Sequence, residues 1–170
     1  MTQEALHGRY KLVLGLFIVC LMLSGLTAFP LLHELRLMGS WLGIESHEAY
    51  SQHAGLKFWL GYVWHGLEVT QVQFPFVAYG TDWLAFGHLM IAVFFMVGPW
   101  RDPVANAWVL KVGLFACACI IPVALICGEV RGIPLSWRLV DCSFGVFGAL
   151  PLIYCLRLVR RMGTGTSRSS

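Results

Sequence analysis

Long runs of apolar residues alternate with shorter polar stretches along this chain. Four of these runs approach or exceed the roughly 20 residues that a helix needs to cross a bilayer core about 30 Å thick. They are Tyr10–Phe29, Thr81–Gly98, Val104–Cys127 and Pro134–Leu156. The pattern predicts an integral membrane protein with four spans.

The longest stretch between two runs follows the first run, and about residues 47–71 have the periodicity of an amphipathic helix. Apolar side chains recur on one side of this helix, at Leu56, Trp59, Leu60, Val63 and Leu67, and polar or small residues take the other side, at Lys57, Gly61, His65 and Glu68. We expect an interfacial helix that lies on the outer leaflet or covers the bundle. A fifth span is the alternative, but it would place four ionisable side chains in hydrocarbon.

The turn between the last two spans is short, because Gly132 closes one span and Pro134 opens the next. These two helices are therefore expected to be antiparallel neighbours. Small residues on the last span, Gly145, Gly148 and Ala149, would let another backbone approach it closely.

The composition indicates one compact membrane domain. Of the 170 residues, 58% are hydrophobic and only 12% are charged, which is too apolar for an ordinary soluble surface. Residues 1–162 are expected to form this domain, and residues 163–170 a disordered tail rich in Ser, Gly and Thr. The expected fold is all-α: an integral membrane four-helix bundle with an extracytoplasmic amphipathic interfacial helix between the first two spans.

Basic residues gather at one set of span ends. They precede the first span, lie between the second and third, and follow the fourth: Arg9, Lys11, Arg101, Arg157, Arg160, Arg161 and Arg168. The positive-inside rule then places both termini in the cytoplasm. Since these positions account for most of the basic residues, the net charge of +3 gives no reason to expect a nucleic-acid partner.

Ionisable residues inside predicted spans mark the candidate site, because such residues usually face a bundle interior or a wet cavity. Counted at about 1.5 Å per residue, His88 and Asp141 both lie roughly 10–12 Å below the outer surface. Arg138 is one turn from Asp141 on the same helix face. The candidate catalytic residues are Asp82, His88 and Asp141, and the candidate binding residues are Glu129, Arg131 and Arg138.

Three accounts of this cluster are open. In the structural account, Arg138 and Asp141 neutralise each other, and Asp82 caps its helix. In the functional account, Asp82, His88 or Asp141 moves a proton, since buried carboxylates and imidazoles can titrate near neutral pH. Arg131 and Arg138 would then hold an anionic head group. The third account is an ion or proton path.

No cofactor or metal centre is expected. A haem would need opposed axial ligands at matching depth, and only His88 lies deep within a predicted span. His65 and Glu68 share a helix face at i, i+3, so they are the weak candidates for a surface metal site. Their spacing matches no strong metal signature, which favours a solvated polar face.

Four stretches between Phe74 and Leu152 carry a family resemblance: FPFVAYGTDWLAFGHLMIA, GPWRDPVANAWV, ICGEVRGIP and SWRLVDCSFGVFGALPL. The region from Phe74 to Leu152, which is a little under half of the chain, resembles a group of uncharacterised small bacterial four-span integral membrane proteins. The resemblance implies a bacterial cytoplasmic (inner) membrane. Because the group has no known activity, it implies no functional residue.

The sequence favours a non-catalytic membrane protein. Under this hypothesis the chain binds a partner protein or a membrane lipid at the extracytoplasmic leaflet, as an accessory subunit of a membrane complex or as a homo-oligomer. The alternative is a membrane-embedded enzyme that acts on a lipid or isoprenoid head group at that leaflet. A small transporter or a redox subunit is disfavoured, because the sequence has no internal repeat and no paired ligands.

Overall fold

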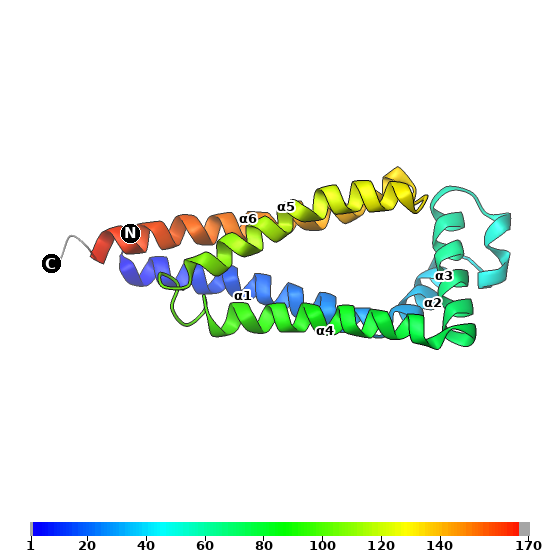
Figure 1. The fold of residues 1–170 in the computed structure, drawn as a ribbon, viewed down its shortest axis with the longest axis horizontal. Coiled ribbons are helices and arrows are strands. Elements are labelled where there is room, and N and C mark those ends of the chain that lie inside the picture. Colours follow the sequence, from blue (N-terminus) through cyan, green and yellow to red (C-terminus); the bar gives the residue numbers. More distant parts are fainter. Residues whose placement is uncertain (1, 167–170) are drawn as a thin grey trace. The chain divides into compact units, whose positions relative to one another are not determined.

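The protein is all-helical over residues 2–166, which are the residues that the computed structural model describes (Figure 1). The elements are α1 (Gln3–Ala28), α2 (Leu31–Trp41), the short 3-10 helix η1 (His47–Gln52), α3 (Gly55–Gln73), α4 (Pro75–Val97), α5 (Ala107–Val130) and α6 (Leu135–Thr166). Of these, α1, α4, α5 and α6 are long and apolar enough to cross a membrane. The expectation of an all-α, multi-pass membrane protein is confirmed at this level.

The long helices extend beyond the apolar runs that predict them. α1 begins at Gln3, ahead of the run that starts at Tyr10, and α6 continues to Thr166, past the expected start of the tail at Gly163. A helix is held by backbone hydrogen bonds, so polar residues can continue it beyond an apolar run. The rest of the predicted tail, 167–170, lies outside the described residues.

The chain divides into two compact units, which we describe one at a time. One unit comprises Met1–Cys20 and Ala92–Ser170, and the other comprises Leu21–Ile91. The boundaries fall inside α1 and α4, so each of these helices contributes residues to both units.

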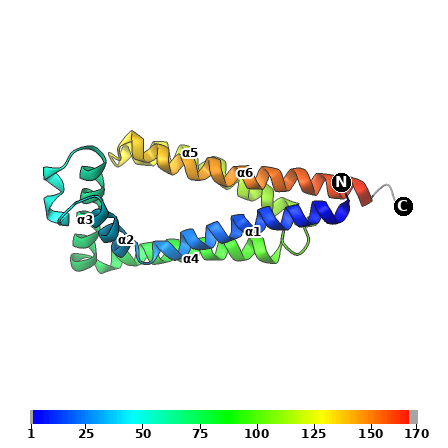
Figure 2. The ribbon, with the colours of Figure 1, turned by 180° about the vertical axis from the view of Figure 1, so that it is seen from behind.

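In the first unit, α5 and α6 lie side by side (Figure 1 and Figure 2). Glycines on α6 make the approach close. A Cβ atom on Gly145 would lie 2.5 Å from the Cys117 carbonyl oxygen, and one on Gly148 would lie 3.1 Å from the Cys117 Sγ. In the turn between the helices, Gly132 has φ +68°, a left-handed conformation that glycine adopts without strain. The two helices are therefore the expected antiparallel neighbours.

The N-terminal part of α1 packs in the same unit against the end of α4 and the turn after it. The Tyr10 hydroxyl donates a hydrogen bond of 2.9 Å to the Pro99 carbonyl oxygen, and both residues are buried. The rings of Phe17 and Phe95 meet edge to face, with centroids 5.1 Å apart. A buried tyrosine needs a partner for its hydroxyl, so this bond fixes α1 on the turn as well as satisfying the side chain.

The second unit contains residues 31–73, which comprise α2, η1 and α3 and which we call the connecting segment. Proline separates it from the apolar helices at both ends, since Pro30 stands between α1 and α2 and Pro75 begins α4. Proline lacks a backbone N–H and disfavours helical geometry in the preceding residue, so α1 and α3 end before it. Figure 1 shows α3 running across the direction of α4.

The helix α2 was not predicted from the sequence. Leu31, Leu35 and Met38 recur at i, i+4 and i+7, but the helix is short, and polar residues interrupt the stripe. Leu35 is buried, which shows that one side of the helix packs inward. The chain then turns toward η1 at Gly43, whose φ of +70° again requires the freedom of glycine.

The predicted helix over residues 47–71 is present as η1 and α3, but the side of α3 expected to face water is a packing side. Gly61 is buried, and a Cβ atom on it would lie 2.8 Å from the Tyr50 Cβ of η1. Trp64 packs over Gly39 of α2, where a Cβ atom would lie 2.7 Å from the Trp64 Cζ3. Periodicity cannot reveal this, because the partners of this side are themselves polar or aromatic.

In the second unit the end of α1 packs against α4. A Cβ atom on Gly25 would lie 3.0 Å from the Ala85 carbonyl oxygen and 3.0 Å from the His88 Cβ. Glycine therefore permits the close approach of the two helices. Both ends of the connecting segment are therefore joined to one pair of packed helices, α1 and α4.

Candidate functional site

Charged and aromatic side chains of α2 and α3 form a network inside the connecting segment. The Arg36 guanidinium donates to the Glu68 carboxylate through Nη2, 2.5 Å from Oε1, and through Nε, 3.3 Å from Oε2. The Trp64 indole N–H donates to the same Oε2 at 3.2 Å. A two-point contact between a guanidinium and a carboxylate fixes orientation as well as charge. Arg36 and Glu68 therefore join α2 to α3 in a defined register.

The carboxylate of Glu68 is held in its charged form. The hydrogen bond from Arg36 is the main cause that lowers the pKa of Glu68; partial burial opposes this effect, and the hydrogen bond from Trp64 adds to it. The Glu68 side chain is 22% exposed, whereas that of Arg36 is 51% exposed. The pair is therefore charged at neutral pH, and its arginine side is open.

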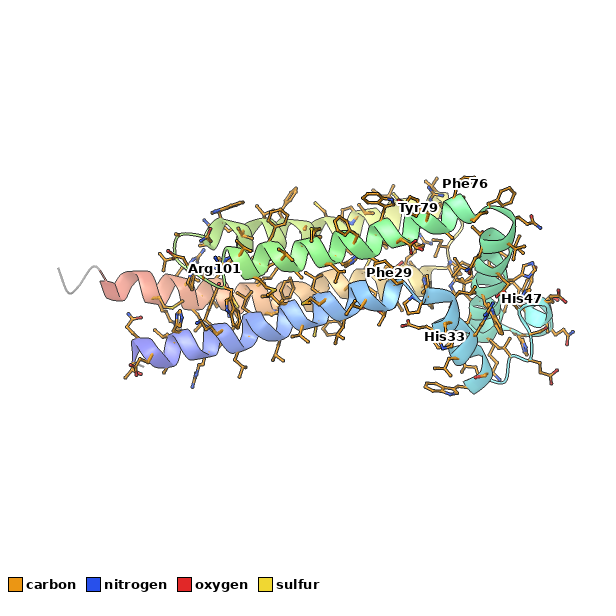
Figure 3. The ribbon with its side chains drawn as sticks, turned by 90° about the horizontal axis from the view of Figure 1, so that it is seen from below. Phe29, His33, His47, Phe76, Tyr79 and Arg101 are labelled. Atoms are coloured by element: carbon orange, nitrogen blue, oxygen red, sulfur yellow. The ribbon has the colours of Figure 1, made fainter. Side chains whose placement is uncertain are left out.

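A pocket of about 400 Å³ lies beside this ion pair, lined from the end of α1, from α2 and from the end of α3. Its lining includes Phe29, Leu32, His33, Arg36, Glu68 and Val72. Figure 3 labels Phe29, which follows α1, and His33, in the first turn of α2. Charged groups and apolar side chains thus share one concave surface, which suits an amphipathic ligand.

A second cluster joins η1 to α3. The Nδ1 atoms of His47 and His65 are 3.0 Å apart, and the two rings stack with centroids 5.3 Å apart. The Tyr50 ring lies against His65, with centroids 5.2 Å apart. A hydrogen bond needs one donor and one acceptor, so one imidazole ring donates this bond and the other accepts it.

Exposed aromatic residues cluster where α4 begins, and we call Phe74, Phe76, Tyr79 and Trp83 the aromatic belt. Phe76 is 73% exposed, and Figure 3 labels it together with Tyr79. The rings of Tyr79 and Trp83 meet edge to face, with centroids 6.0 Å apart. Tyr and Trp side chains are enriched at the boundary between hydrocarbon and water.

Two of the predicted binding residues, Glu129 and Arg138, meet in the first unit. The Arg138 Nη1 lies 2.5 Å from the Glu129 Oε2 and donates to the Leu125 carbonyl oxygen at 3.2 Å. The structural account expected Arg138 to pair with Asp141, but among the described residues its ion pair is with Glu129. Gly128 makes this possible, because its missing side chain leaves room for the Arg138 stem to cross toward α5.

The remaining candidates are divided between the units. Arg131, exposed at the end of α5, and Asp141, half-buried on α6, belong to the first unit. Asp82 and His88 lie on the part of α4 that belongs to the second unit. The His88 Nδ1 is 2.9 Å from the Leu84 carbonyl oxygen, one turn earlier on its own helix. That these residues gather into a single site stays a prediction.

His65 and Glu68, the candidates for a surface metal site, belong to separate contacts. His65 faces His47, whereas Glu68 is bonded to Arg36 and Trp64. Within residues 2–166, no group of three or more His, Cys, Asp or Glu side chains is placed to hold a metal ion.

Sequence reasoning did not find Arg36 and His33 as candidate site residues. The available signal was charge, because Arg36 is one of few basic residues in the stretch that the positive-inside rule predicts to be extracytoplasmic. Its partner Glu68 is 32 residues away, and no local pattern shows that the two meet.

Comparison with known proteins identifies no relative: the chain matches no protein-family model, no curated protein and no solved structure. The resemblance of residues 74–152 to small bacterial four-span membrane proteins stays a prediction.

Proposed function

We propose that this is a non-catalytic integral membrane protein whose connecting segment lies at the outer surface of a bacterial cytoplasmic membrane and binds a membrane lipid there. The observation that carries the proposal is the pocket beside Arg36 and Glu68. It combines a charged pair with an apolar lining at the point where the first apolar helix ends. A lipid presents the same combination, because its charged head group adjoins its acyl chains.

The positions of the basic residues support the proposed orientation, with both termini in the cytoplasm. These residues lie in the first half of α1, in the turn between α4 and α5, and near the end of α6, at Arg9, Lys11, Arg101, Arg157, Arg160 and Arg161. Figure 3 labels Arg101 in its turn. Four spans arranged as a bundle would bring all of them to one side and the connecting segment to the other.

Exposed apolar side chains support an interfacial position for the connecting segment. Leu60 of the apolar stripe on α3 is buried, but Leu56 on the same stripe is 60% exposed, and Val72 near the end of the helix is 76% exposed. The aromatic belt adjoins the C-terminal end of the segment. Contact with the headgroup region of the outer leaflet, or with a partner subunit, would remove this surface from water.

Two of the candidate binding residues, Glu129 and Arg138, are bonded to each other. The His88 Nδ1 bonds to a carbonyl oxygen of its own helix and leaves Nε2 for another contact, so these contacts favour neither the non-catalytic nor the catalytic role. The enzyme alternative, with Asp82, His88 and Asp141 acting on a lipid or isoprenoid head group, stays a prediction.

Photo-crosslinking in cells tests the proposal. A photoreactive amino acid at Val72, which lines the pocket and is 76% exposed, should form an adduct with the mass of a phospholipid. The control position is Glu48, an exposed residue of η1 outside the pocket lining, where we expect no lipid adduct. A cross-link from Val72 to another membrane protein would favour an accessory subunit instead. Absence of a lipid adduct at Val72 would contradict lipid binding at the pocket.

A further inference from the structure

We infer that the pocket binds the head group of a zwitterionic phospholipid that carries a primary ammonium, as in phosphatidylethanolamine, with Arg36 on the phosphate and Glu68 on the ammonium. The inference rests on the proposed lipid-binding function and names the class of lipid. It follows from the hydrogen-bonding positions that the ion pair leaves open on its pocket side.

Arg36 keeps donors for a phosphate. A guanidinium carries more N–H donors than the two that Glu68 uses, one on Nε and one on Nη2. The side chain is half exposed and lines the pocket, so its remaining donors can reach a ligand without displacing Glu68. His33, one turn earlier on α2, lines the same pocket and can supply a further N–H.

The first turn of α2 adds backbone donors at the same place. Its N-cap is Pro30, which lines the pocket, and no side chain caps the helix. The first N–H groups of a helix have no partner within it, and a phosphate at that end is also favoured by the helix dipole. Glu34 belongs to the same turn but does not line the pocket.

Glu68 provides the counterpart for a cation. A carboxylate offers about four lone-pair positions, and Arg36 and Trp64 fill three of them. One position is left for an ammonium N–H. Since the charges of Arg36 and Glu68 cancel, a zwitterionic head group leaves the pocket neutral. An anionic head group would instead leave an unmatched negative charge beside Glu68.

The apolar lining accounts for the part of the lipid next to its head group. Phe29 and Leu32 lie beside His33, and Val72 lies one turn beyond Glu68 on α3. A volume of about 400 Å³ is at the lower end of the range for small-molecule sites, and it suits a head group with the start of its acyl chains rather than a whole lipid.

Native mass spectrometry of the full-length protein in detergent tests the inference. The probes are dioctanoyl phosphatidylethanolamine, phosphatidylglycerol and phosphatidylcholine at equal concentrations. We expect the ethanolamine lipid to bind about tenfold more strongly than the glycerol lipid, which is the scale of one charge-assisted hydrogen bond. The choline lipid should also bind more weakly than the ethanolamine lipid, because its quaternary ammonium has no N–H to donate to Glu68.

Variants assign the preference to the ion pair. Glu68→Gln should still bind lipid but lose the preference for the ethanolamine lipid over the glycerol lipid. Arg36→Gln should lower the affinity for all three lipids by about tenfold. Lys57→Gln and Glu48→Gln remove the same charges outside the pocket lining and should bind as the wild type does. Thermal unfolding in the same detergent shows which variants are folded.

Val72→Trp provides a test that leaves the ion pair untouched. Val72 is mostly exposed, so the larger side chain can be accommodated in the fold while it fills the pocket and excludes every lipid. Equal binding of the ethanolamine and glycerol lipids, or a preference that survives Glu68→Gln, would overturn the inference and leave lipid binding in place. If the wild type binds no lipid, or if Val72→Trp binds lipid as strongly as the wild type, lipid binding at the pocket is overturned as well.

Discussion

Two arginines of this protein hold carboxylates in different settings. The Arg36 side chain is 51% exposed, whereas that of Arg138 is 14% exposed. Exposed ion pairs contribute about 0–1 kcal/mol, so the main effect of the Arg36–Glu68 pair is to set the register of α2 on α3. Arg138 is mostly buried, and a buried charge without a partner is costly. Glu129 therefore matters to Arg138 chiefly because it prevents that cost.

The Arg36–Glu68 pair predicts an acid-induced change in the connecting segment. The pKa of Glu68 in the folded protein is lower than its ordinary value of 4.5. The pair therefore stabilises the folded segment at pH values above 4.5, and this stabilisation is lost as the pH falls through the lower, folded-state pKa. Trp64 donates to the same carboxylate, so tryptophan fluorescence, read as the difference from a Trp64→Phe variant, should report the loss.

The control for the acid-induced change is a pair of matched variants. Glu68→Gln cannot titrate, so its fluorescence difference should show no acid step. Glu48→Gln removes an exposed carboxylate of η1 and should keep the step. An acid step of wild-type size in Glu68→Gln would show that another group causes it.

At the scale of elements, glycines set how closely the helices of the connecting segment approach. Gly39 is buried on α2 beneath the Trp64 ring, and Gly61 is buried on α3 against Tyr50. Gly66, also on α3, has no atom within 4 Å of the place where a Cβ would stand. Helical glycines in one segment therefore have opposite roles, two allowing contact and one merely weakening its helix.

This difference predicts that alanine changes the stability of the connecting segment in opposite directions at the two positions. Gly39→Ala should destabilise the connecting segment by about 1–3 kcal/mol, because the Trp64 ring would have to move. Gly66→Ala should stabilise it by about 0.5–1 kcal/mol, because alanine is the better helix former and meets no neighbour. Urea unfolding in detergent, followed by tryptophan fluorescence, measures both. Equal shifts of the two variants would contradict the close packing of α2 on α3.

The sequence predicts some of these elements better than others. Run length identifies the four apolar helices, and the spacing of Leu56, Leu60 and Val63 identifies α3, because both signals are local. The packing side of α3 was not predictable, since it depends on Arg36, which is 32 residues from Glu68 in the sequence. The pocket depends on the same pairing, so it could not be predicted either.

At the scale of the whole molecule, apolar surface dominates. Large apolar side chains are exposed on all four long helices, among them Leu12, Phe94, Phe115 and Phe147. Soluble proteins rarely expose continuous apolar surface of this extent, and a bilayer would cover it. The composition of the sequence predicts a membrane protein directly. Counting depth along each span could not show which candidate residues meet, since that depends on how the helices pack.

The proposed topology predicts opposite labelling of two positions. Lys57→Cys, on the exposed start of α3, should react with a membrane-impermeant maleimide added to intact cells. Arg160→Cys, near the end of α6, should react only after the membrane is permeabilised, because the positive-inside rule places it in the cytoplasm. The wild-type protein gives the background from native cysteines. Reaction of both positions from the same side would contradict the three spans that the proposed topology places between them.

The close contact between Gly25 and Ala85 also affects the conformational entropy of the chain between them. A segment whose ends are already held together has fewer unfolded conformations, so less free energy is needed to order it. For residues 31–73 the contact between the end of α1 and the middle of α4 has the effect of a cross-link. A half-exposed ion pair and one pair of histidines can then keep the segment folded, whereas the same peptide excised from the chain would be less stable.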